Sequence, residues 1–142
     1  MLETTSDNNT VNTLKEQILP LIEDLRYPSE SDEAVEYFEM EYTTSESIGI
    51  QDFKLFNGIE PDKSIDSITV EDFFAPLTKV EDWFGEEEKK YVGDALKLQA
   101  LLTEHLKDIQ VLKVGEVEIG VYLFGIYEEN KWAGVKTIII ET

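Results

Sequence analysis

The C-terminal part of the chain carries three runs rich in Val, Ile, Tyr and Phe, separated by short polar segments. Runs of β-branched and aromatic residues are typical of strands. The segments between them are too short for the crossover that parallel strands require, so they predict an antiparallel meander. The predicted strands are residues 110–114, 117–127 and 135–141, with turns at residues 115–116 and 128–131.

A long helix is predicted directly before this meander, over residues 86–107. Three glutamates open it and Lys107 closes it, and both placements suit the helix dipole. Its inner face is predicted from apolar spacing as Val92, Ala95, Leu96, Gln99, Leu102 and Leu106. Helices packed on the faces of a mainly antiparallel sheet define an α+β class domain.

A second helix is predicted near the N-terminus, where Thr13 and Glu16 form a capping box. Its apolar stripe comprises Leu14, Ile18, Leu21, Ile22 and Leu25. We expect Pro20 to kink this helix and Pro28 to end it, because the residue before a proline avoids the α conformation.

The region between the two helices gives weaker signals. Residues 27–33 have the composition of a loop, and residues 35–42 alternate as a strand with Phe38, Met40 and Tyr42 on one face. Residues 48–56 are predicted as a further strand, which brings the sheet to about four to five strands.

Two sequence signals precede the long helix. Residues 69–72 read as the start of a short helix. Residues 78–81 read as another capping box, starting a turn that carries Asp82, Trp83 and Phe84.

Length and charge restrict the functions open to this chain. Its 142 residues fit one domain, predicted over residues 13–142 behind a flexible tail of residues 1–12. The formal net charge of −19 argues against binding to nucleic acid or to anionic membranes, both of which attract Lys and Arg. The chain has no cysteine, and its N-terminus has no signal-peptide pattern, so we expect a cytoplasmic protein.

The residue types that carry catalysis are scarce. His105 is the only histidine, lies near the end of a helix and has no evident partner, so a structural role is favoured over a catalytic one. No phosphate-binding glycine loop occurs, and no cofactor is expected. With so many carboxylates some pair will always have a plausible separation for glycoside hydrolysis, so a hydrolase is the least favoured interpretation.

One acidic stretch stands out, because no Lys or Arg occurs between Tyr27 and Phe53. On charge alone, a solvated acidic face is the favoured interpretation. A calcium loop is disfavoured because the glycine and the ligand spacing are missing. A surface that imitates a polyanion needs only exposed carboxylates opposite a basic partner.

Several short motifs follow one another in a fixed order from about residue 70 onward. They are Glu81-Asp82-Trp83-Phe84, Glu86-Glu87-Glu88, Gly115-Glu116-Val117-Glu118, Val121-Tyr122, Gly125, Ala133-Gly134 and Glu141-Thr142. Together they resemble the nuclease A inhibitor family of small acidic bacterial and plant proteins. The N-terminal third fits the resemblance through Ser29-Glu30-Ser31 and Glu36-Tyr37-Phe38, whereas residues 42–68 do not align.

The resemblance implies a three-layer α-β-α sandwich that is not an enzyme. It implies an inhibitor that plugs the active site of a sugar-nonspecific, magnesium-dependent endonuclease of the ββα-metal type. Glu30 would point to the metal of the target enzyme, Asp82 and Trp83 would contact that enzyme, and Thr142 would enter its cleft. No metal is expected in the free protein, which we expect to be a monomer.

Two alternatives remain open at this point. In relatives a Tyr-Pro pair follows the Ser-Glu-Ser loop, whereas here Tyr27-Pro28 precedes it. Alignment on that pair would move the metal-facing role from Glu30 to Asp24. The other alternative is an acidic interaction module of the same fold, with a different basic partner and no nuclease inhibition.

Overall fold

The computed structural model describes residues 14–28, 32–41, 50–128 and 131–141. The predicted tail of residues 1–12, the capping residue Thr13 and the predicted strand residue Tyr42 lie outside them. Two of the proposed contact residues, Glu30 and Thr142, also lie outside the described residues.

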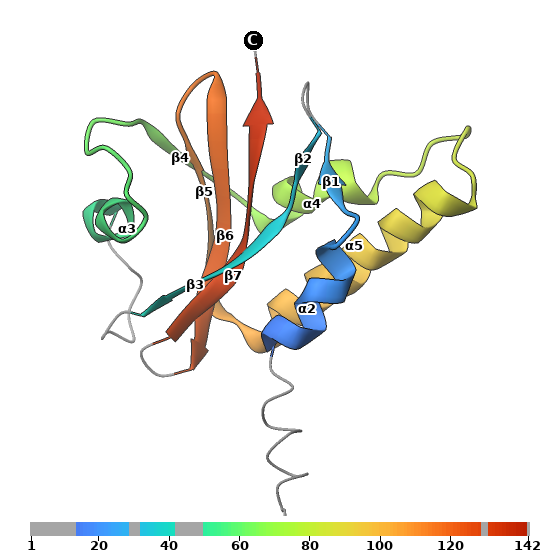
Figure 1. The fold of residues 1–142 in the computed structure, drawn as a ribbon, viewed down its shortest axis with the longest axis horizontal. Helices are drawn as coiled ribbons and strands as arrows, with labels where there is room; N and C mark the ends of the chain where they lie inside the picture. Colours follow the sequence, from blue (N-terminus) through green and yellow to red (C-terminus); the bar gives the residue numbers. More distant parts are fainter. Residues whose placement is uncertain (1–13, 29–31, 42–49, 129–130, 142) are drawn as a thin grey trace, which may run out of the picture.

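A five-stranded antiparallel sheet forms the centre of the molecule, in the order β3-β7-β6-β5-β4 (Figure 1). Its strands are β3 (Glu36–Glu41), β4 (Ile65–Ile68), β5 (Lys107–Val114), β6 (Glu118–Glu128) and β7 (Lys131–Ile140). The predicted meander is confirmed, because β5 pairs with β6 and β6 pairs with β7. Gly115 adopts a φ of 103° beside the turn between β5 and β6, a conformation that side chains disfavour.

Three helices cover one face of the sheet: α2 (Leu14–Ile22), α4 (Val70–Thr78) and α5 (Glu86–His105) (Figure 1). The core between them and the sheet includes Ile18, Phe73, Leu98, Leu102 and Leu123, all of which are fully buried. The predicted start of α4 is confirmed, since the Asp72 N–H donates to the Thr69 hydroxyl over 3.0 Å.

The opposite face carries α3 (Ile50–Phe56), which completes the three layers (Figure 1). The strand predicted over residues 48–56 is therefore wrong for residues 50–56, and residues 48–49 lie outside the described residues. Phe53 and its neighbour Lys54 are both buried, which a helix face permits and strand alternation does not. The Phe53 ring stacks on Phe124 of β6 with centroids 5.0 Å apart and an angle of 11°.

Gly58 ends α3 in the left-handed conformation, with a φ of 67°. The Ile59 N–H donates to the Lys54 carbonyl over 2.9 Å, which closes the turn. The Lys54 ammonium then donates to the Pro61 and Lys63 carbonyls at 2.6 and 2.8 Å, so it holds the loop that leads to β4.

A short hairpin replaces the loop predicted at residues 27–33. Strand β1 (Arg26–Tyr27) pairs antiparallel with β2 (Glu33–Ala34), so Glu30 lies between the two strands in the sequence. The Tyr27 hydroxyl donates to the Phe73 carbonyl over 2.6 Å, and the Thr137 hydroxyl donates to the Ala34 carbonyl over 2.7 Å. Side-chain hydrogen bonds thus attach the hairpin to α4 and to β7.

Other predictions need correction in detail. Helix α2 ends at Ile22, before Pro28 as predicted, but Leu25 of the predicted stripe lies beyond the helix, where it is still buried. Thr78 does not cap a helix, because its hydroxyl donates to the Phe74 carbonyl inside α4. On α5, Leu96 is 52% exposed and Leu98 takes the buried position, since Ala95, Leu98 and Leu102 follow at helical spacing.

Among the described residues, no helix is both long and apolar enough to cross a membrane.

Candidate partner-binding surface

The connection between α4 and α5 holds Asp82 and Trp83 in a defined turn. The Phe84 N–H donates to the Glu81 carbonyl over 3.1 Å, which closes the turn around them. The Gly85 N–H donates to a carboxylate oxygen of Glu88 over 2.8 Å and so begins α5. The predicted turn is therefore present. One hydrogen bond closes it at Phe84, and a second fixes Gly85 at the start of α5.

Trp83 presents its side chain to solvent, with 73% of its surface exposed. Its ring meets Phe84 edge to face, with centroids 4.6 Å apart and an angle of 79°. The other tryptophan, Trp132, is fully buried in the core under α3. Trp132 therefore stabilises the core, whereas Trp83, at the surface, has no such role. Asp82 is exposed beside it.

A groove of about 460 Å³ opens next to this turn. Four separate segments line it: the residues leading into β1, the end of α4, the turn and the first half of α5. Besides Trp83 and Phe84, its apolar surface comes from Leu25, Pro28, Pro76, Leu77, Tyr91 and Val92.

A second hollow of about 610 Å³ lies beside the first, and Pro28 and Pro76 line both. Its other lining residues include Tyr27, Asp72, Lys113 and Glu141. The end of β7 and the β1–β2 hairpin accordingly lie at the same end of the molecule (Figure 1).

The two hollows share Pro28, and each also contains a residue at or next to a predicted site residue. Pro28 is two positions before Glu30, and Glu141 directly precedes Thr142. Glu141 shares the second hollow with Pro28, and Trp83 shares the groove with Pro28. The structure thus places Pro28 between Trp83 on one side and Glu141 on the other, while Glu30 and Thr142 themselves stay outside the described residues.

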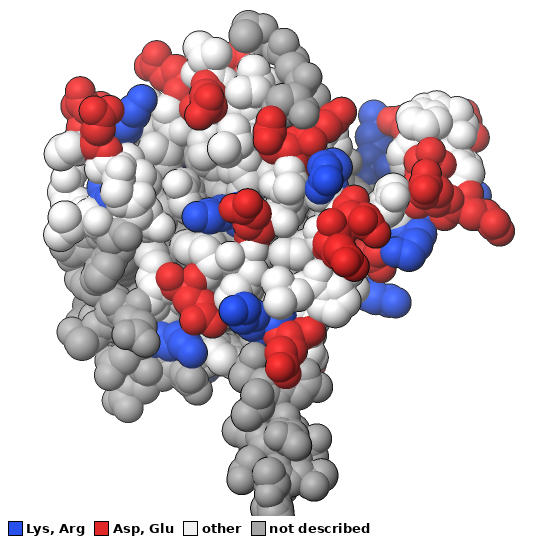
Figure 2. Space-filling view, viewed as in Figure 1, with Lys and Arg blue, Asp and Glu red and all other residues white. Residues whose placement is uncertain are grey.

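Acidic side chains act on Tyr27 in the second hollow. Burial, followed by the carboxylates of Asp72 and Glu141, raises the pKa of the Tyr27 hydroxyl to about 12. The Glu141 carboxylate lies 3.7 Å from the Lys113 ammonium. Figure 2 shows acidic side chains, with lysines and arginines among them, on the part of the molecule that carries the α4–α5 turn.

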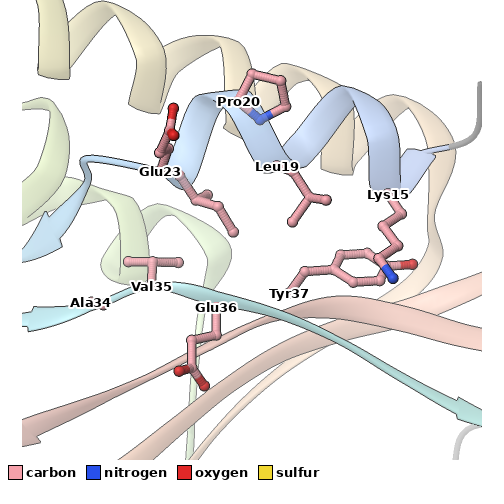
Figure 3. Close-up of a pocket in the computed structure, with 9 residues that line it drawn as sticks. Lys15, Leu19, Pro20, Glu23, Ala34, Val35, Glu36 and Tyr37 are labelled. Atoms are coloured by element: carbon pink, nitrogen blue, oxygen red, sulfur yellow. The ribbon is translucent and has the colours of Figure 1, made fainter.

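A third hollow, between α2 and β3, lacks the geometry of a two-carboxylate active site (Figure 3). Leu19 and Tyr37 extend into it, and the Lys15 ammonium lies 5.9 Å from the centre of the Tyr37 ring. Glu23 and Glu36 also line it, but the Glu36 carboxylate points away from the space and from Glu23 (Figure 3).

Other chemical groups do not form a second site. His105 ends α5 at the surface, and its nearest acidic partner is the neighbouring Glu104 at 3.4 Å. The part of the chain that the structure describes contains no group of three or more His, Asp or Glu residues placed to hold a metal ion.

Fold and surface together define a three-layer α+β protein with an exposed tryptophan and an apolar groove at the turn before α5. The family model described as nuclease A inhibitor-like protein matches residues 12–142, and the chain belongs to this family. The match confirms the resemblance and extends through residues 42–68, which the sequence comparison left unaligned. A search among curated proteins gave no match. Family membership supports a role in nuclease inhibition in general.

Sequence reasoning missed most of the groove. Tyr91 was not predicted, although it lies three positions after Glu88 of the acidic motif and therefore shares its helix face. Pro28 was predicted to end a helix and was compared with the Tyr-Pro pair of relatives, but neither it nor Pro76 was predicted to line a groove. The spacing of three between Glu88 and Tyr91 could have indicated Tyr91. No pattern within any one segment indicates that the four segments come together.

Proposed function

We propose that this protein inhibits a sugar-nonspecific, magnesium-dependent endonuclease of the ββα-metal type by blocking its active site. It acts as a binding protein and not as an enzyme. Glu30, Asp82, Trp83 and Thr142 form the contact region, and the metal involved belongs to the nuclease.

One observation carries the proposal: the exposed Trp83 shares a groove with Pro28, at the base of the hairpin that contains Glu30. Interfaces are enriched in tryptophan, and a large exposed aromatic ring beside an apolar groove is typical of a binding surface. The second hollow, which joins Pro28 to Glu141, supports a contribution from the C-terminal end of β7.

The chemistry of a nuclease cleft complements this end of the molecule. Such a cleft binds phosphate, so it is basic and holds a hard cation with positions open to oxygen ligands. A carboxylate between β1 and β2 can approach one of those positions, which is the role we assign to Glu30. Asp82 supplies a further charge for a basic side chain on the rim.

The alternative is an acidic interaction module of the same fold that binds another basic partner. The net charge of −19 and the exposed Trp83 favour that function equally. The inhibitor and the interaction module differ in whether the target is a nuclease, so a nuclease assay distinguishes the two functions.

The test compares two glutamates of the hairpin in a plasmid-degradation assay with purified ββα-metal nucleases. Glu30→Gln removes the proposed metal-facing charge, whereas Glu33→Gln makes the same change at an exposed position on β2. We expect wild-type protein to stop degradation at near-equimolar ratio. Glu30→Gln should weaken inhibition at least about tenfold, because a charge-assisted contact is lost.

The Glu33→Gln control should stay within about threefold of wild type, as expected for a rim charge. Equal losses in both variants would reject the assigned role of Glu30. If the wild-type protein inhibits none of the nucleases, the inhibitor function is wrong and the alternative stands.

A further inference from the structure

We propose that the groove beside Trp83 is a receptor for one arginine side chain of the partner. This inference deepens the proposed function and rests on it for the identity of the partner, but the groove can be tested without a nuclease. It adds Tyr91, Asp24 and Glu88 to the contact residues.

The groove has the walls that a guanidinium requires. Three aromatic side chains line it, Trp83, Phe84 and Tyr91, together with the rings of Pro28 and Pro76. A planar guanidinium stacks on aromatic faces, and its three-carbon stem packs on apolar surface. Tyr91 already has a cation near its ring, since the Lys90 ammonium lies 5.8 Å from the ring centre.

Charge in the lining also favours a cation. The acidic lining residues are Asp24, Glu81 and Glu88, against Arg26 and Lys79. Lys79 is held by Glu81 over 3.2 Å, and Arg26 donates to the Leu25 carbonyl over 3.3 Å. Asp82, which precedes Trp83 in the turn, adds a further exposed carboxylate.

An arginine fits better than the other candidate side chains. A carboxylate would meet acidic neighbours, and a wholly apolar side chain would gain no attraction from the carboxylates in the lining. A lysine offers a compact ammonium that stays more strongly hydrated than a guanidinium. A nuclease that must bind phosphate has arginines available around its cleft.

The test uses the full chain and a short probe, the peptide acetyl-Gly-Arg-Gly-amide. The two tryptophans give two indole N–H signals by NMR, one exposed from Trp83 and one buried from Trp132. We expect a saturable shift of the Trp83 signal at millimolar peptide and no shift of Trp132. The matched peptide with citrulline, which keeps the shape but lacks the charge, should not produce it.

Substitutions in the lining should change the affinity for the peptide in opposite directions. Asp24→Asn should weaken binding about threefold, and Arg26→Gln should strengthen it by a similar factor, because exposed charge pairs contribute modestly. Glu87→Gln makes the same charge change as Asp24→Asn outside the groove and should leave affinity unchanged. Tyr91→Leu should weaken binding about threefold, and Tyr91→Phe should retain it, since the ring supplies the attraction.

Each outcome bears on the groove separately from the nuclease. An arginine-dependent shift of Trp83 with the expected order of variants supports the receptor, even if no nuclease is inhibited. Equal shifts with arginine and citrulline, or a shift that Asp24→Asn and Glu87→Gln reduce alike, would overturn it. Failure of the arginine peptide to bind, together with nuclease inhibition that is the same for Tyr91→Leu and wild type, would also overturn it.

Discussion

Pro28 and Trp83 line the same groove, although one precedes the predicted Glu30 loop and the other lies in the turn before α5. Pro28 also lines the hollow that contains Glu141. Three segments that are remote in the sequence therefore meet around the β1–β2 hairpin. The predictions below follow from this arrangement and from the two cores that support it.

Truncation of Trp83 should separate binding from stability. Its side chain is 73% exposed, so Trp83→Ala should change the free energy of unfolding by no more than about 0.5 kcal/mol. A buried aromatic anchor in a complex contributes about 2 kcal/mol or more, so inhibition should weaken roughly 30-fold. Urea unfolding and a nuclease titration measure the two effects. A large loss of stability would contradict the exposed position of this ring.

The other tryptophan should behave in the opposite way. Trp132 is fully buried beside Phe124, with ring centroids 6.0 Å apart. Trp132→Ala leaves a large cavity and should cost about 3–5 kcal/mol of unfolding free energy. The fraction that remains folded should retain wild-type affinity for the partner. Titration calorimetry can check this if the concentration of folded variant, rather than the total, is used. Lost affinity in folded protein would place Trp132 in the contact region.

Association with a basic partner should depend strongly on salt. With a net charge of −19, long-range attraction raises the association rate at low ionic strength. We expect the association rate constant to fall at least about tenfold between roughly 50 mM and 500 mM salt, with a smaller change in dissociation. Stopped-flow fluorescence of Trp83 can follow this. An association rate that does not respond to salt would argue against a basic target.

Tyr27 should make stability fall at alkaline pH. The pKa of its hydroxyl is raised from 10.0 to about 12 in the folded protein, mainly by burial. The folded state therefore prefers the protonated form, and its advantage is complete below pH 10 and is lost as the pH rises through 12. In urea unfolding, the stability of wild type relative to Tyr27→Phe should decline across this window.

The Tyr27→Phe variant also loses the hydrogen bond to the Phe73 carbonyl, which should cost about 1 kcal/mol at neutral pH. Because an ionised Tyr27 cannot donate this hydrogen bond, wild type loses it over the same pH range. Unfolding curves that keep a constant separation from pH 8 to pH 12 would show that the Tyr27 proton is not linked to folding.

The sequence predicted those parts of the fold that depend on neighbours along the chain. The meander of β5, β6 and β7 follows from short turns between apolar runs, and the start of α4 follows from the Thr69 cap. Helix α3 was mistaken for a strand because its burial depends on Phe53 and Lys54 reaching two different partners, the Phe124 ring and the carbonyls of a later loop.

The candidate site was accessible from the sequence only in part. Trp83 could be selected from its motif, but its exposure depends on how the turn closes at Phe84 and how Gly85 begins α5. The groove forms only where the hairpin region, α4 and α5 come together. The hairpin itself was not predicted, because residues 27–33 were expected to form a loop. Long-range packing of this kind leaves no periodic signal in a single segment.

The most direct test of the central claim is a titration of a ββα-metal nuclease with this protein, at a nuclease concentration well above the dissociation constant. Initial rates of plasmid cleavage in magnesium buffer are measured as the molar ratio increases. A protein that blocks the active site should lower the rate in a straight line that reaches zero at one molecule per nuclease active site. Undiminished cleavage at a large molar excess, across several nucleases of this type, would contradict the account.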